Sequence, residues 1–104
     1  MHIDDLVILY ALAIETAPAG AFYFAENGEN SMREASEAIN RMLGFAGPPT
    51  AMSMAEAAAE WSEGTTEDTM ASNSRVRAKR ARQLGWKPKA RGLVEEIEQG
   101  CYRE

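Results

Sequence analysis

The chain is 104 residues long, 45% hydrophobic and 26% charged, with a formal net charge of −5 at pH 7. That length suits one domain, residues 1–104, and that composition excludes a wholly disordered chain. The longest apolar run, residues 6–14, is far short of the roughly twenty residues that cross a bilayer, and no segment resembles a secretion signal, so we expect a cytoplasmic protein with no membrane contact.

The first predicted element is a helix over residues 6–14, whose interior is apolar on nearly every side. Such a helix packs between two layers or against a partner. Asp4 or Asp5 can cap its N-terminus. Together with His2 they are also candidate metal ligands, but no later cluster of histidine or cysteine completes a site, so we favour capping and expect no metal.

A strand and a helix are predicted next. Residues 21–25 are aromatic and lie between two glycine-containing turns, which indicates a strand. Ser31 and Glu34 then form a capping box, and apolar residues recur at helical spacing until Gly44. This pattern predicts a helix over residues 31–43.

A second strand and helix follow a Gly-Pro-Pro break. Residues 50–52 predict the strand, and Ser53 and Glu56 form a second capping box that opens a helix over residues 54–61. The order strand, helix, strand is most easily closed as a right-handed parallel crossover. We therefore expect an α/β fold that is rich in helices, about five in all, with a small two-stranded parallel βαβ element.

The last third of the chain predicts a loop and two helices. Residues 62–72 lack periodicity and indicate a surface loop with at most a helical turn. Residues 73–84 predict a basic helix that is closed by Gly-Trp-Lys-Pro, with Trp86 as a packing anchor. Residues 92–99 predict the final helix, which Gly100 ends.

Charge is divided unevenly along the chain. Residues 1–70 carry twelve acidic and two basic side chains, whereas residues 71–104 carry nine basic and four acidic ones. The basic residues between Arg75 and Arg91 favour a solvated face or internal ion pairs with the acidic part of the chain. A phosphate-containing ligand is the second interpretation, and nucleic acid is the third, because no aromatic residues are interleaved for base stacking.

Six short segments share their order with one protein family. They are His-Ile-Asp-Asp-Leu at 2–6, Gly-Ala-Phe-Tyr-Phe-Ala at 20–25, the two capping boxes, the basic helix that ends in Leu-Gly-Trp-Lys-Pro at 84–88, and Gly-Leu-Val-Glu-Glu-Ile at 92–97. Across almost the whole chain they resemble the C-terminal part of extended short-chain dehydrogenase/reductases, the NAD-dependent epimerase/dehydratase family. The resemblance implies the substrate-binding lobe of such an enzyme without its nucleotide-binding Rossmann domain.

The residues that carry this family's chemistry are missing. A Rossmann unit needs a Gly-rich turn close to the pyrophosphate, and no G-x-x-G-x-x-G occurs. The family's Tyr-x-x-x-Lys pair is absent too, since Ile14 follows Tyr10 and Asn27 follows Tyr23 at that spacing. We therefore expect no catalytic residue, no hydride transfer and no cofactor in this chain by itself.

Candidate binding residues follow from the same resemblance. The family's lobe helps to enclose a substrate, often a nucleotide-sugar, which makes Trp61, Asn73 and Arg75 candidate ligand contacts; for Trp61, packing in the core is favoured and ligand contact is the alternative. Without a partner domain the first helix would expose its apolar face, so we expect a homo-oligomer or a separate partner domain. The interface residues expected on that helix are Leu6, Leu9, Tyr10 and Ala13.

Three functions remain open from the sequence. The first is a non-catalytic stand-alone relative, or fragment, of an epimerase/dehydratase substrate-binding lobe, with a small ligand such as a nucleotide-sugar. The second is a structural or interaction module that acts by self-association or through a partner protein. The third is nucleic-acid binding by residues 75–91, which would make retention on DNA or RNA sensitive to salt.

Overall fold

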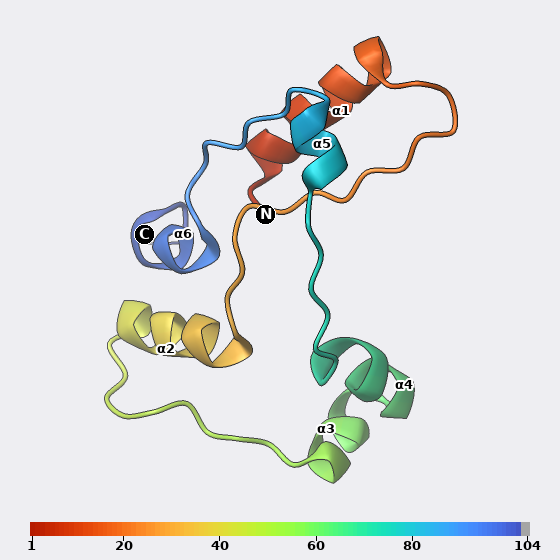
Figure 1. Cartoon of the computed structure of the whole chain (residues 1–104). Helices are drawn as coiled ribbons and strands as arrows, with labels where there is room; N and C mark the ends of the chain where they lie inside the picture. Colours follow the sequence, from red (N-terminus) through yellow and green to blue (C-terminus); the bar gives the residue numbers. More distant parts are fainter. Residues whose placement is uncertain (103–104) are drawn as a thin grey trace.

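A computed structural model describes residues 1–102 of the chain. Its helices are α1 (Ile3–Thr16), α2 (Met32–Leu43), α3 (Met54–Trp61), the single turn α4 (Glu63–Thr65), the π-helical turn η1 (Thr66–Met70), α5 (Lys79–Gln83) and α6 (Leu93–Gln99). Figure 1 shows α5 beside α1, α6 beside α2, and α3 with α4 apart from both pairs. Long extended segments connect these three groups.

The predicted α/β fold with a βαβ element is wrong, because residues 1–102 contain no strand. Residues 21–25 and 50–52 are non-helical, but a strand also needs a second segment at about 4.8 Å to exchange backbone hydrogen bonds. The first segment bonds to side chains instead. The carbonyl of Phe22 accepts from Arg80 Nη1 (3.4 Å), and the carbonyl of Glu26, directly after the segment, accepts from Arg82 Nη2 (3.1 Å).

The first core joins α1 to α5 through Trp86, whose predicted role as an anchor is confirmed. Trp86 is 1% exposed and packs with Leu9, Ala78 and Ala81. Gly85 (φ +107°) ends α5, and the amides of Gly85 and Trp86 donate to the carbonyls of Arg82 and Ala81. This Schellman turn brings the indole against α1. Because position 85 has a positive φ, a β-branched or bulky residue there would be strained.

The second core joins α2 to α6. Ala35, Ala38 and Ile97 are buried there, with Met42 and Val94 packed against them. The predicted capping box of α2 is confirmed, because the Glu34 amide donates to Ser31 Oγ (3.2 Å) and the Ser31 amide donates to Glu34 Oε2 (2.6 Å). The predicted helices at 31–43, 54–61 and 92–99 therefore match α2, α3 and α6.

The predicted helix over residues 73–84 is present only in its C-terminal half, as α5. Residues 73–78 are not helical. Arg75 and Arg77 reach Glu29, and the amide of Ala78 donates to Glu26 Oε1 (3.2 Å). These bonds to a segment about fifty residues earlier replace the first helical turn that the local sequence favours.

The molecule is open rather than closely packed. Its radius of gyration is 16.9 Å, whereas a compact chain of this length has about 13 Å. The difference arises because residues 44–53 and 71–78 lead to and from the unit of α3, α4 and η1 without helix or strand (Figure 1). Residues 62–72, predicted as a surface loop with at most a helical turn, contain two consecutive turns, α4 and η1, over residues 63–70. None of the described helices has the length and apolar character to span a membrane.

Candidate functional site

Two hydrogen-bonded junctions hold the first core together, and the first, made by Asp5, fixes the position of α1. This carboxylate is 2% exposed, and its Oδ1 and Oδ2 accept from the amides of Lys89 (2.8 Å) and Ala90 (3.0 Å). The backbone carbonyl of Asp5 accepts from Trp86 Nε1 at 2.8 Å. Asp5 therefore ties the first turn of α1 to the segment that follows α5.

The predicted capping by Asp4 or Asp5 is wrong. The N-cap of α1 is His2, whose Nδ1 accepts from the amide of Asp4 at 3.2 Å. The side chain of Asp5 instead accepts hydrogen bonds from residues more than eighty positions later in the chain. No local sequence pattern reveals such distant partners. Within residues 1–102, no group of three side chains is arranged to hold a metal ion.

Glu26 makes the second junction. Its Oε1 accepts from Arg82 Nη1 (2.5 Å) and from the amide of Ala78 (3.2 Å), and its Oε2 accepts from the amide of Gly28 (3.0 Å). The hydrogen bond from Arg82, followed by the one from Ala78, holds the pKa of Glu26 below its usual value. Because the Arg82 guanidinium also lies 5.8 Å from the centre of the Trp86 ring, this junction supports the same indole.

With α1 held in this way, one apolar face of the helix remains uncovered. Ile3, Val7, Tyr10 and Ile14 are 64%, 59%, 65% and 84% exposed. They are spaced four, three and four residues apart, so they form one stripe along the helix. We call these four residues the α1 stripe. Their spacing is that of a helix seam that packs against another helix or an apolar surface.

The expected interface residues lie beside this stripe or beneath it. Leu9 is buried in the first core, Leu6 and Ala13 are half-buried, and Tyr10 belongs to the α1 stripe. All four line a hollow of about 300 Å³ between α1 and residues 21–25. The expected interface on residues 6–14 was assigned to those four residues and not to Val7 and Ile14, and it left out Ile3; the spacing of these residues marks one face of the helix but does not show whether that face is covered.

The candidate ligand residues are dispersed. Trp61 ends α3 and is 43% exposed, and Asn73 is exposed in the segment after η1. Arg75 lies 3.9 Å from Glu29 and, with residues 26–30 and 74–77, lines a second hollow of about 260 Å³. Neither Trp61 nor Asn73 lines that hollow, so the structure does not gather the three residues into one site.

Four of the eight basic residues between Arg75 and Arg91 form ion pairs within the part of the chain that the structure describes. Arg75 and Arg77 pair with Glu29, Arg82 pairs with Glu26, and Arg91 lies near Glu95 and Glu96. Most of these guanidiniums are about half exposed, where an ion pair contributes about 1 kcal/mol or less. The pairs of Arg75, Arg77 and Arg82 with Glu29 and Glu26 are the internal ion pairs with the acidic part of the chain that were one of the two favoured interpretations.

Comparison of the chain with protein-family models, with curated proteins and with solved structures found no match. The resemblance to the epimerase/dehydratase lobe therefore stays a prediction.

Proposed function

We propose that the chain is a non-catalytic docking lobe, similar to the substrate-side lobe of extended short-chain dehydrogenases, and that it binds another folded surface through the α1 stripe. The observation that carries this proposal is the stripe itself: Ile3, Val7, Tyr10 and Ile14 form one face, and each is more than half exposed. A contiguous apolar surface of this kind marks an interaction site. Burying one large apolar side chain contributes about 1.5–3 kcal/mol, so four of them can support a specific contact.

The position of α1 supports the proposal. The N-terminal turn of the helix is tied to Lys89, Ala90 and Trp86 through Asp5, and its middle is packed on the first core through Leu9. The stripe is thus presented on an anchored helix and needs no ordering when a partner binds. A preorganised face loses less conformational entropy on association.

The openness of the molecule also supports docking. Two small cores leave Phe22, Phe24 and Phe45 at least 48% exposed, in addition to the α1 stripe. Docking on a second body would cover part of this surface. The partner is either a second copy of the chain or a separate domain.

A photo-crosslinking experiment tests the docking function. A benzophenone amino acid at Val7 places the reactive group in the stripe, and the same group at the exposed Thr16, nine residues later, places it on the opposite side of the same helix. We expect cross-linked adducts in cells from position 7 and not from position 16, and loss of them when Ile3 and Ile14 are changed to serine.

Light scattering separates the two kinds of partner, because a second copy gives a dimer of the purified chain at micromolar concentration. A clean monomer together with equal cross-linking from positions 7 and 16 would contradict the proposal.

Ligand binding is the second candidate, favoured by the hollow beside Arg75. Asn27, Asn30, Ser74 and Arg77 line it together with Glu26 and Glu29. Amide, hydroxyl, carboxylate and guanidinium groups together suit a hydroxyl-rich ligand such as a sugar nucleotide. Calorimetric titration with a nucleotide-sugar should show saturable heat that Arg75→Ala reduces, whereas NAD(H) should show none.

A further inference from the structure

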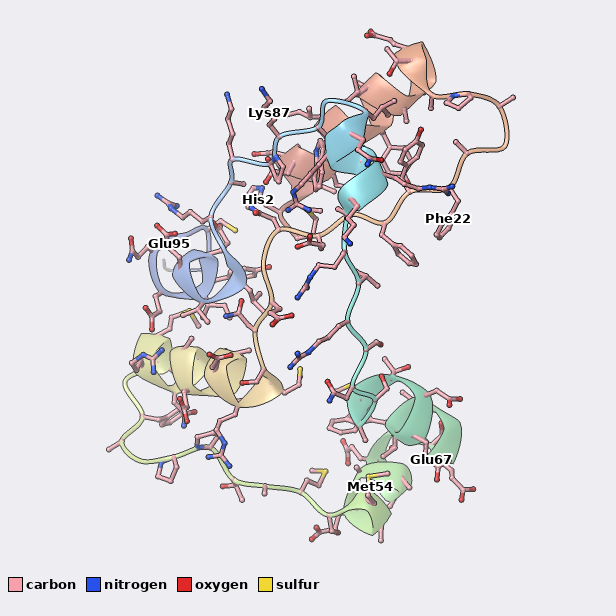
Figure 2. The ribbon with its side chains drawn as sticks, viewed as in Figure 1. His2, Phe22, Met54, Glu67, Lys87 and Glu95 are labelled. Carbon is pink, nitrogen blue, oxygen red and sulfur yellow. The ribbon has the colours of Figure 1, made fainter. Side chains whose placement is uncertain are left out.

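The unit of α3, α4 and η1 carries a second exposed apolar face, distinct from the α1 stripe. Met54, Ala58 and Trp61 are spaced four and three residues apart, so they lie on one side of α3. Met54 is 51% exposed and Trp61 is 43% exposed. Met52 before the helix and Met70 at the end of η1 are also exposed, at 54% and 40%. Figure 2 places Met54 on this unit, away from the other helices.

Hydrogen bonds and buried residues within this unit stabilise its local structure. Its helix α3 starts with a complete capping box, in which Ser53 Oγ accepts from the amide of Glu56 and the amide of Ser53 donates to Glu56 Oε2. Ala57 and Thr66 are buried, and Thr66 Oγ1 donates to the carbonyl of Ser62 at 2.8 Å. The methionines and Trp61 are therefore carried on a folded scaffold.

The charge of this unit has one sign. Residues 50–72 contain no lysine, arginine or histidine, and their acidic residues are Glu56, Glu60, Glu63, Glu67 and Asp68. The carboxylate of Glu56 is used by the capping box, whereas the structure pairs none of the other four with a cation in residues 1–102. Figure 2 shows Glu67 on this unit, far from Lys87.

We propose that the unit of α3, α4 and η1, here called the α3 unit, binds a basic amphipathic helix of another protein. Methionine side chains are flexible and polarizable, so they adapt to the apolar side of such a helix, and Trp61 adds a flat contact. The carboxylates around them attract lysine and arginine on the other side of the helix. A nucleic acid or an anionic membrane would be repelled by the same charges.

The size of the face sets the strength of this interaction. An α-helix of the length of α3 is only about 12 Å long, so the contact falls well below the size of a standard protein interface. We therefore expect rapid, salt-sensitive binding with a dissociation constant in the micromolar range or weaker.

A synthetic peptide with leucine and lysine at helical spacing is the probe. Trp61 is partly exposed and Trp86 is fully buried, so binding should shift the emission of Trp61 to shorter wavelength. Trp61→Phe should remove the shift but keep binding, measured by anisotropy of a labelled peptide. The dissociation constant should rise about tenfold or more between low and high salt, because exposed charges are screened.

Matched variants assign the binding to this face. Met54→Ser with Met70→Ser should abolish binding, and Glu60→Gln, Glu63→Gln and Glu67→Gln together should weaken it and reduce its salt dependence. Ile3→Ser with Ile14→Ser, in the α1 stripe, should leave it unchanged, and circular dichroism should confirm that each variant is folded. The proposal is overturned by no saturable binding, by equal binding of a leucine and glutamate peptide, or by binding that only the α1 variant abolishes.

Discussion

Asp5 is the single side chain on which the position of α1 depends most. It is buried, and its two oxygens accept from the amides of Lys89 and Ala90. Asp5→Ala leaves both amides without their acceptor, which should lower the free energy of unfolding by about 2–3 kcal/mol. Urea denaturation followed by fluorescence of the buried Trp86 measures this change.

Asp4 offers the matched control for that substitution. It is the neighbouring residue of the same type, but its side chain is 79% exposed. Asp4→Ala removes a favourable charge near the N-terminus of α1 and an exposed contact with His2 (3.6 Å), and it should cost less than about 1 kcal/mol. Equal effects at positions 4 and 5 would show that the contact with Lys89 and Ala90 does not hold the helix in place.

Glu26 gives the fold a dependence on acid. Hydrogen bonds from Arg82 and then Ala78 lower its pKa in the folded state, so the unfolded chain takes up a proton first as the pH falls. The stability that Glu26 contributes is therefore complete above its ordinary pKa of 4.5 and is lost as the pH falls through the lower, folded-state pKa. Glu26→Gln should flatten the loss of stability below pH 4.5 in urea titrations across that range.

A substitution of Arg82, the ion-pair partner of Glu26, tests the same dependence of stability on pH. Arg82→Gln removes the largest cause of the lowered pKa and should flatten the same pH window. Part of the acid sensitivity should remain in both variants, because hydrogen bonds from the amide and hydroxyl of Ser31 also lower the pKa of Glu34 in α2. Full acid sensitivity in both variants would refute the role of the pair.

At the scale of the helix, the two capping boxes use the same chemistry in different surroundings. Ser31→Ala should cost about 1 kcal/mol of global stability, since α2 is packed on α6 in the second core. Ser53→Ala should unfold α3 locally and leave the rest of the molecule unchanged. Hydrogen exchange read by mass spectrometry distinguishes the two, and faster exchange in α6 after Ser53→Ala would contradict the expectation.

The helices with complete local signals were predictable from the sequence. Ser31 with Glu34 and Ser53 with Glu56 mark the starts of α2 and α3, because each box is satisfied within four residues. Gly85 likewise predicted the end of α5 and the anchoring of Trp86. In these elements the hydrogen bonds that set the helix ends join residues close together in the sequence, so the sequence pattern predicts them.

The elements that were predicted wrongly depend on partners that are distant in the sequence. The aromatic composition of residues 21–25 suits a strand, but Tyr23 and Ala25 pack on the first core and no second strand lies alongside. Helix α5 starts at Lys79, later than predicted, because Glu26 and Glu29 bind the residues that precede it. Of the candidate site, the apolar character of α1 was predictable, whereas its uncovered face depended on which side Trp86 occupies.

At the scale of the whole molecule, the α3 unit should be a separate structural part. It is joined by non-helical segments on both sides, and its buried residues Ala57 and Thr66 belong to neither of the two cores. Residues 54–70 can therefore be replaced by glycine and serine residues of equal number, which keeps the reach of the connection. The free energy of unfolding reported by Trp86 should change by less than about 1 kcal/mol, because the replaced residues contribute no contact to either core. Loss of the buried Trp86 fluorescence in this variant would show instead that the α3 unit stabilises the rest of the chain.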